Sequence, residues 1–506
     1  MAWMGGIRIA KERLGSGTAR VTGADGCTRA KPAALGIEPL VVTTPTPVEN
    51  SPDQDRDRPS GGGRESRGHM GRIVAGSLAV GLLAALLLAA APFISPEEDA
   101  VTGALLCGFA IGWATLALLS ARFTDQPQRW AAVPAVFLGV SGLLLIGFGA
   151  TLREVLNWVW PPALLAVVVW MVVGAHRQLR SRSRRWLLYP VFAVVTLVAV
   201  GGGYESVREA ADASAYPMPG RLIDVGGHRL HLHCTGSGGP TVVLQPGAGD
   251  YSSGMVWIAR AVASQTRVCV YDRASRGWSE PAESPQDATQ LAIELHTLLE
   301  RGDVPGPYVM AGHSFGGLYV LTYADRYPDE VAGMVLVDST NRATEADPEK
   351  ATAYDGGSYD AVTDRVAALG AAAARIGLVR LVGSSFGYGD LPPESRDEAR
   401  ANTATADYAA GWIDEFVQAN ASGAEAAMLT DFGDKPLVVL TAGAETNPTH
   451  DAAQTKLATL STDSSHRVVE GASHAGLVTD EQYAKTTTRA VLDVVASVRS
   501  TAPLTR

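Results

Sequence analysis

The pattern of hydrophobic and polar positions divides the chain into a polar tail, an apolar region and a mixed region. Residues 1–71 are polar and lack sustained apolar periodicity, so they cannot bury enough apolar surface to offset the entropy of ordering them. We predict that this tail is disordered. Residues 72–203 are mostly apolar, and residues 204–220 are polar with two prolines, which predicts a linker. Residues 221–506 have the mixed pattern of a soluble globular domain.

The apolar region contains five hydrophobic stretches. Each is close to the ~20 residues that an α-helix needs to cross the hydrocarbon core of a bilayer. Five such stretches in succession favour transmembrane helices over the alternative, a set of buried helices in a large soluble core. The predicted spans are residues 72–94, 101–120, 131–150, 157–174 and 186–203.

The loops between these stretches predict an orientation. Arginines gather in the loops 121–130 and 175–185, whereas the loop 95–100 is acidic. Because positively charged loops stay in the cytoplasm, we predict a cytoplasmic N-terminus in a multi-pass protein of the plasma membrane. Five crossings then place everything after Gly203 on the outer side. The spans contain no carboxylate or lysine that would mark an ion path, so we expect an anchor or an interaction module.

In the globular part, short apolar runs alternate with stretches of helical spacing. Gly226-Gly227 separates two short runs, which predicts an early β-hairpin. The later alternation predicts an α/β fold, with a mostly parallel sheet and helices on both faces. The predicted strands are 221–225, 229–234, 241–245, 267–272, 308–311, 333–338, 436–441 and 466–470, and the clearest helices are 287–300, 317–326 and 481–498.

One of these strand-to-helix junctions carries a catalytic motif. Gly312-His313-Ser314-Phe315-Gly316 fits the pattern G-x-S-x-G, with an apolar run before it and helix-compatible residues after it. The glycines flank a strained turn, on which larger side chains would collide with the neighbouring strand and helix. This context favours a nucleophile elbow over an ordinary glycine-rich turn.

Four stretches together resemble the α/β-hydrolase fold, over about residues 221 to 500. They are the loop Pro246–Gly249, the stretch Tyr271–Ser279, the elbow itself and the loop Gly471–His474. The resemblance implies a mostly parallel eight-stranded sheet, here preceded by about five transmembrane helices. It also implies that residues 340–435 form a helical cap, which would set substrate choice and exclude water.

The resemblance assigns roles to several residues. Ser314 is the expected nucleophile, and His474, on a small-residue loop near the end of the chain, is the expected base. The acid is open between two residues. Asp338 ends the strand after the elbow and is favoured, whereas Glu445 follows the next strand and is the alternative. The backbone N–H groups of Phe315 and Ala248 are expected to form the oxyanion hole.

The other histidines are predicted to lie outside the site. His313 is expected to point away from Ser314, and His450 to lie in a polar loop. His231 and its neighbours on the early hairpin are expected to face solvent. In the resembled fold the strands that carry Cys234 and Cys269 pair, and an outer location permits a disulfide between them. The alternative is two free, buried thiols.

The composition narrows the function further. The net charge of −10 and the lack of a basic patch argue against a nucleic-acid partner, and no cofactor or metal motif is present. The leading hypothesis is a membrane-anchored serine hydrolase, which cleaves an ester or related acyl bond of a small-molecule or lipid substrate through an acyl-enzyme on Ser314. The alternative is a non-catalytic binding or sensor module on a membrane anchor.

Overall fold

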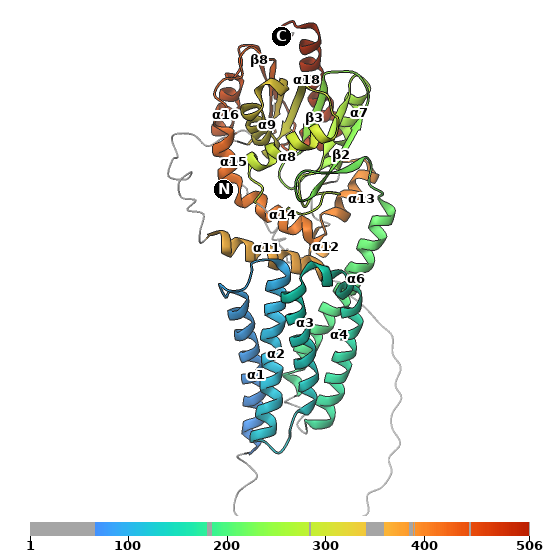
Figure 1. Ribbon diagram of the computed structural model, residues 1–506, viewed down its shortest axis with the longest axis vertical. Coiled ribbons are helices and arrows are strands. Elements are labelled where there is room, and N and C mark those ends of the chain that lie inside the picture. Colours follow the sequence, from blue (N-terminus) through green and yellow to red (C-terminus); the bar gives the residue numbers. More distant parts are fainter. Residues whose placement is uncertain are drawn as a thin grey trace, which may run out of the picture. The chain divides into compact units, whose positions relative to one another are not determined.

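A computed structural model describes most of the chain after the polar tail (Figure 1). The predicted disordered tail lies outside the described residues, apart from its last six positions, which begin a helix. Glu445 also lies outside them. The described residues are 66–179, 185–282, 285–340, 359–383, 388, 390–444 and 447–504.

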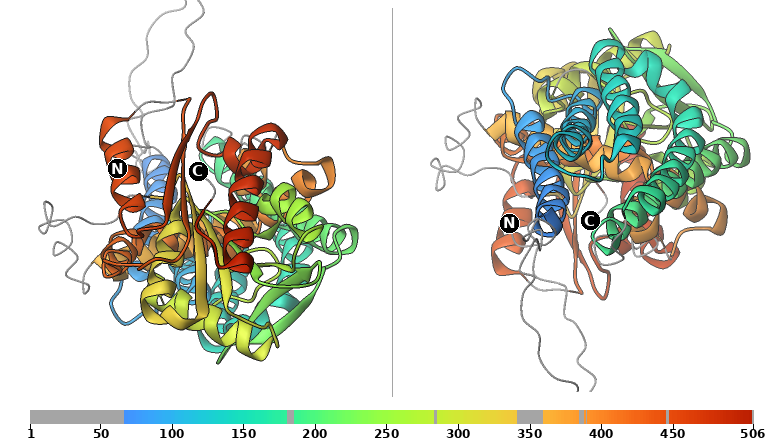
Figure 2. Two further views of the ribbon diagram at one scale, coloured as in Figure 1. Left: turned by 90° about the horizontal axis from the view of Figure 1, so that it is seen from above. Right: turned by 90° about the horizontal axis from the view of Figure 1, so that it is seen from below.

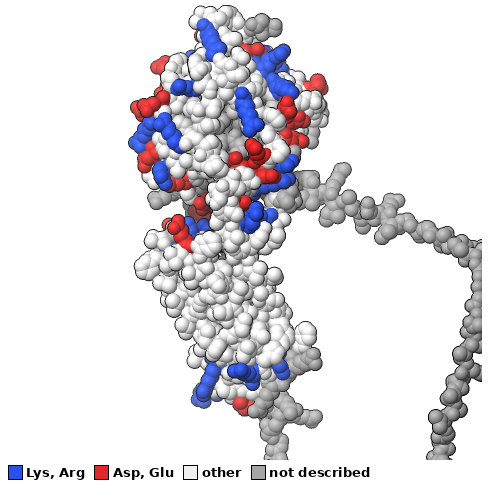
Figure 3. Space-filling model, turned by 90° about the vertical axis from the view of Figure 1, so that its right-hand side faces the viewer, with Lys and Arg blue, Asp and Glu red and all other residues white. Residues whose placement is uncertain are grey.

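Among the described residues of the apolar region, five helices are each long and apolar enough to cross a membrane. This confirms the five apolar helices expected from the sequence. Figure 3 shows that, on the face drawn, a belt without charged residues runs along them. The helices are α1 (Ser66–Ala89), α2 (Glu98–Phe123), α3 (Ala132–Phe148), α4 (Ala150–Gln178) and α6 (Tyr189–Ala215).

Helix α6 is longer than expected, because it continues through most of the predicted linker. Its polar residues have partners that stabilise the helix there. Arg208 pairs with Asp212 one turn later at 3.1 Å, and Glu205 is buried against a cap arginine. Helix α4 likewise begins before the predicted span 157–174, at Ala150, and Pro161 and Pro162 stand inside it.

The globular part contains one eight-stranded sheet, as the resemblance implied. Its strand order is β1-β2-β4-β3-β5-β6-β7-β8. The pairs β1–β2 and β2–β4 are antiparallel, and every neighbouring pair from β4 to β8 in this order is parallel. The carboxyl ends of the parallel strands therefore meet along one edge of the sheet, which we call the loop edge. The strands are β1 (Arg221–Asp224), β2 (Arg229–Thr235), β3 (Thr241–Gln245), β4 (Val268–Tyr271), β5 (Tyr308–His313), β6 (Val331–Val337), β7 (Leu437–Ala442) and β8 (Ser464–Val469).

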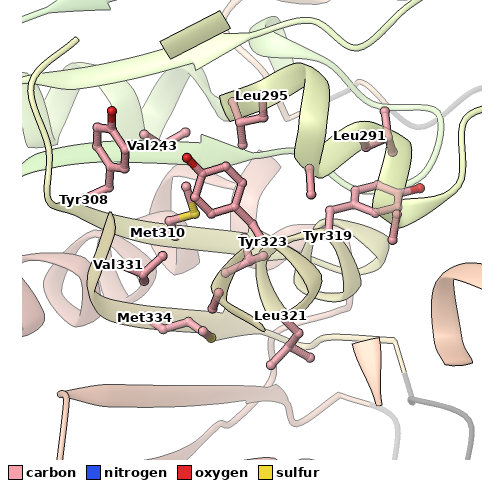
Figure 4. Close-up of a cluster of buried hydrophobic side chains, with 14 of the residues drawn as sticks. Val243, Leu291, Leu295, Tyr308, Met310, Tyr319, Leu321, Tyr323, Val331 and Met334 are labelled. Atoms are coloured by element: carbon pink, nitrogen blue, oxygen red, sulfur yellow. The ribbon is translucent and has the colours of Figure 1, made fainter. Parts of the chain in front are cut away.

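Helices cover both faces of the sheet (Figure 2). On one face, α8 (Ala288–Arg301) and α9 (Phe315–Arg326) enclose a buried cluster with β3, β5 and β6 (Figure 4). On the other, α7 (Val256–Ala263) and α18 (Glu481–Ser500) enclose a second cluster. The two cores fix the sheet as a rigid base for its loop edge.

The early hairpin gave one confirmed expectation and one wrong one. Cys234 of β2 lies opposite Cys269 of β4, and the two form the predicted disulfide. His231 does not face solvent, since its side chain is fully buried. Its Nδ1 lies 2.8 Å from Asp272 and its Nε2 lies 2.5 Å from the carbonyl oxygen of Pro219. These two acceptors offset the cost of burying the ring, which alternation along the strand could not reveal.

Among the described residues, five helices lie between β6 and β7, where the helical cap was expected. The helix that begins at Ala406 is capped by Thr405, whose side chain accepts from Tyr408 N–H. The cap helices are α11 (Tyr359–Arg375), α12 (Leu378–Gly383), α13 (Pro393–Asn402), α14 (Ala406–Val417) and α15 (Ala419–Ala426).

Candidate active site

Ser314 occupies a strained turn between β5 and α9. Its φ of 55° and ψ of −123° are rare for a residue with a side chain. Two backbone hydrogen bonds hold it in place. Ser314 N–H donates to Val337 at 3.1 Å, and the Ser314 carbonyl accepts from Thr340 N–H at 3.1 Å. The turn is thus fixed against the end of β6, with the serine side chain at the loop edge of the sheet.

The two motif glycines are required by close backbone contacts. A Cβ atom at Gly312 would overlap the carbonyl oxygen of Gly316, and a Cβ atom at Gly316 would overlap that of Gln245. Each contact is with main chain, which cannot move aside as a flexible side chain can. This geometry explains why glycine stands two positions on either side of Ser314.

Asp338 and His474 lie together at the same edge. His474 Nδ1 is 2.5 Å from Asp338 Oδ2, and Ala442 N–H donates to Asp338 Oδ1 at 3.0 Å. Asp338 directly follows β6 and is buried, whereas the ring of His474 is 44% exposed. Of the two acids that the sequence left open, the described residues place Asp338 on this histidine.

A second histidine contacts the same carboxylate. His450 Nε2 lies 2.9 Å from Asp338 Oδ1. Burial alone would raise the pKa of Asp338, but the hydrogen bonds from His450, His474 and Ala442 N–H outweigh it and hold that pKa below its usual range. The hydrogen bond to Asp338 in turn raises the pKa of His450.

The prediction that His450 lies in a polar loop is therefore wrong. It stands in the first turn of α16 (Pro448–Ala458), whose N-cap is Asn447. Asn-Pro is a helix-start signal that could have indicated the helix. Nothing in the sequence showed that this helix turns its first residues toward Asp338.

His313 also contributes to the site, through the loop that carries His474. Its Nε2 lies 3.0 Å from the His474 carbonyl oxygen, and the centroids of the two rings are 4.6 Å apart. Burial, aided by the charge of His474, lowers the pKa of His313 to about 3. Neutral His313 therefore donates its Nε2–H and positions the backbone that carries His474.

Hydrogen bonds do not connect all of the expected catalytic residues in the part of the chain that the structure describes. Among the described residues, no hydrogen bond links the hydroxyl of Ser314 to His474. Such contacts are often long without substrate and shorten in the reactive complex. Ser314, Phe315 and Ala248 are all partly exposed at the loop edge. The backbone of Gly247 lies directly against the elbow, since a Cβ atom there would be 3.0 Å from the Cβ atom of Ser314.

The loop that carries Ala248 is tied to the cap by a buried ionic cluster. Arg273 donates to the carbonyl oxygens of Pro246 and Gly247 at 2.9 and 2.7 Å, and to Glu415 of α14 at 2.8 Å. Glu415 also accepts from Gly249 N–H at 2.7 Å. Burial would raise the pKa of Glu415, but the charges of Arg273 and Arg276 outweigh it and lower that pKa. No pattern in the sequence indicated this cluster.

Within the described ranges, no group of three or more histidines, cysteines or carboxylates is arranged to hold a metal ion. The residues that meet at the loop edge are a strained serine, a histidine bonded to a buried carboxylate, and the N-terminus of α9. This arrangement fits nucleophilic attack with proton transfer.

Comparison with known proteins agrees with the fold. A model of the family described as alpha/beta hydrolase fold matches residues 240–481. The globular part of the chain is therefore an α/β-hydrolase fold, as the four resembling stretches implied. A thermophilic esterase from Thermogutta terrifontis aligns over 55% of this chain and 99% of its own, at 20% identity and a TM-score of 0.40.

Curated relatives match over shorter segments. The probable transporter efuK of Hormonema carpetanum is 31% identical over 132 residues, which are 24% of this chain and 19% of that protein. The uncharacterized protein YbdG of Bacillus subtilis is 28% identical over 150 residues, which are 29% of this chain and 46% of YbdG. This chain thus matches between about a fifth and about half of these relatives' lengths.

Proposed function

We propose that this protein is a membrane-anchored serine hydrolase, which cleaves an ester or related acyl bond through an acyl-enzyme on Ser314. One observation carries the proposal. The buried Asp338 carboxylate accepts from His474 at the edge of the sheet where Ser314 stands on its strained turn. A serine hydroxyl needs such a base before it can attack a carbonyl carbon.

In this proposal each residue has a defined step. His474 Nε2 takes the hydroxyl proton of Ser314 as Ser314 Oγ bonds to the acyl carbon. His474 then donates this proton to the leaving group. Asp338 holds Nδ1–H and stabilises the imidazolium. The N–H groups of Phe315 and Ala248 stabilise the oxyanion. Water, activated by the same histidine, then releases the acid and restores Ser314.

We further propose that the site faces the outer side of a cell membrane and that the N-terminus is cytoplasmic. The ends of α2 and α4 that carry Arg122 and Arg177 would lie inside, and Glu98 at the start of α2 outside. The disulfide between Cys234 and Cys269 supports an oxidising, external compartment for the globular part.

Covalent labelling tests the catalytic proposal. A fluorophosphonate probe should label the full chain in detergent or nanodiscs, and Ser314→Ala should abolish that labelling. An acyl-chain-length series of esters then defines the substrate class. Labelling that persists in Ser314→Ala would contradict the assignment of the nucleophile.

A second candidate is a non-catalytic binding or sensor module. The observation that favours it is the missing hydrogen bond between Ser314 and His474 among the described residues. A folded protein whose Ser314 does not react with the probe, at any pH between about 6 and 9, would support this candidate instead.

A further inference from the structure

Two cap helices expose a set of large apolar side chains. Val362, Val366 and Leu369 of α11 are 63%, 51% and 46% exposed. Their spacing places them on one face of the helix. Single exposed apolar residues are ordinary, but a set on two consecutive helices marks an interaction surface. The set is completed in α12 by Leu378, Leu381 and Val382, which are 49%, 74% and 64% exposed.

The cap itself uses the other side of α11. Ala371 and Ala374 are buried and pack with Ala406 at the start of α14. At about 100° per residue, these alanines lie across the helix from Val362 and Leu369. The exposed face is therefore left over after the cap has folded.

Polar contacts hold α11 at the ends of two apolar helices. The guanidinium of Arg365 donates to three carbonyl oxygens, of Ala89, Ala91 and Ile94, at 3.0 to 3.1 Å. Arg375 forms a two-pronged ion pair with Glu98, whose second contact is 2.9 Å. Ala89 is the last residue of α1 and Glu98 is the first residue of α2. Helix α11 therefore lies where both helices leave the layer formed by the apolar helices, here called the apolar layer (Figure 1).

The turn between α11 and α12 is attached to α6 at a similar level. A Cβ atom at Gly201 would overlap the carbonyl oxygen of Ile376, so the two backbones are in direct contact. One turn further along α6, Glu205 accepts from Arg380 at 2.6 Å. In α6 the apolar sequence gives way to polar residues between these two positions. Helix α12 therefore also lies at the boundary of the apolar layer.

Exposed apolar residues of the membrane helices lie beside these attachment points. Leu87 near the end of α1 is 63% exposed, Phe93 in the following turn is 78% exposed, and Leu197 of α6 is 71% exposed. In a bilayer such residues face lipid. The six apolar residues of α11 and α12 lie on helices that are attached at these same helix ends.

We propose that Val362, Val366, Leu369, Leu378, Leu381 and Val382 form a lipid-contact surface. This surface lies in the boundary between headgroups and acyl chains of the bilayer that anchors the chain, as amphipathic interfacial helices do. The inference rests on the proposed membrane anchoring and does not depend on the hydrolytic chemistry. It places the lipid-contact surface one helix from the elbow, since α14 packs on α11 and its Phe416 ring contacts Phe315.

A fluorescent label on the full chain tests the proposal. Because Cys234 and Cys269 are joined, replacing the other two cysteines of the full chain (Cys27→Ser and Cys107→Ser) leaves no free cysteine, and Leu381→Cys then takes a single NBD group. The labelled protein is placed in phosphatidylcholine–phosphatidylglycerol nanodiscs with or without nitroxide-labelled lipids. Val468→Cys, at a 54% exposed position of β8, is the water-facing control, and Leu87→Cys is the lipid-facing control.

We expect the label at position 381 to emit at shorter wavelength than at 468, and nitroxide lipids to quench it at least twofold more. A label at 381 that behaves like that at 468, while the label at 87 is quenched, would overturn the lipid-contact surface and leave the anchoring intact. A label at 87 that lipids do not quench would overturn the anchoring and this inference together. Loss of fluorophosphonate labelling at Ser314 would contradict the proposed hydrolytic chemistry alone, and neither the anchoring nor the lipid-contact surface.

Discussion

Two regions of the molecule are held in place in different ways. At the elbow, backbone contacts close to the strand ends position Ser314 and its two glycines. In the cap, side-chain contacts between segments far apart in the chain hold α11 and α12 on the apolar helices. Gly312 and Gly316 fix the first region through main-chain contacts. In the second, Arg375 is 277 residues from Glu98 and Arg380 is 175 residues from Glu205.

The difference teaches where each region can change. The main-chain contacts around Ser314 are closely packed and cannot shift. The conformation of the nucleophile is therefore determined once β5, β6 and α9 have formed. Ion pairs and apolar contacts hold the cap, and a single substitution can weaken them without altering the sheet. The predictions below test this contrast, beginning with the largest effect.

Replacing the proposed acid should have the largest effect. Asp338→Asn keeps the shape of the side chain but can neither stabilise the imidazolium nor fix the tautomer of His474. We expect kcat/KM to fall roughly 10³- to 10⁴-fold with little loss of fold. Glu445→Gln is the matched control and should change the rate less than threefold, about 0.7 kcal/mol. The reverse ranking would assign the acid to Glu445.

Breaking the cap attachment should cost stability and leave the proposed chemistry in place. Arg380→Met leaves the buried Glu205 carboxylate without its main partner, and such an uncompensated charge costs about 3 to 5 kcal/mol. The loss is measured as a lower midpoint of thermal unfolding in detergent. The double variant Glu205→Gln, Arg380→Met should recover most of it.

The control for this pair lies on the same helix. Arg208→Met removes one of the two arginine partners of Asp212, where the Arg208 side chain is 46% exposed, and should cost less than about 1 kcal/mol, because Arg380 still pairs with Asp212 at 2.9 Å. Equal losses for Arg380→Met and Arg208→Met would mean that the buried pair does not hold the cap.

The glycine contact with the cap gives a smaller, local effect. Gly201→Ala should push the turn at Ile376 away from α6 and cost about 1 to 3 kcal/mol. At Gly202 the added methyl would lie 3.7 Å from the carbonyl oxygen of Arg375, so Gly202→Ala should be neutral or slightly stabilising. Hydrogen exchange of the α11 and α12 amides distinguishes the two, because faster exchange is expected with Gly201→Ala. Equal exchange in both variants would contradict the contact.

The same contrast explains what the sequence could predict. The elbow and the alternation of strands and helices follow from local patterns, whereas the eight-stranded sheet and the helical cap were implied by the resemblance of four stretches to the α/β-hydrolase fold. Asp338 was favoured because it ends the strand beside the elbow. The edge where these residues meet is set by parallel strand pairing, which the alternation of strands and helices already implies.

The missed features depend on contacts between distant segments. The positions of His313 and His450 around Asp338 and His474 required the paths of β5 and α16. Glu415 has the sequence of an ordinary polar position on a cap helix, yet it is buried between two arginines. A buried charge and its partner look like solvated residues until the fold brings them together.

The last prediction concerns His450 and gives the smallest effect. Because the pKa of folded His450 is raised above 6.5, its charge stabilises the fold fully below that pH and this contribution is lost as pH rises through the folded pKa. His450→Gln keeps a hydrogen-bond donor for Asp338 but no charge. We expect it to lower stability by about 1 kcal/mol near pH 5.5 and by progressively less toward pH 9. Thermal midpoints of both proteins across this range measure the difference. A difference that grows with pH would show that Asp338 does not bind the charged form of His450, and that the carboxylate depends on His474 and Ala442 N–H instead.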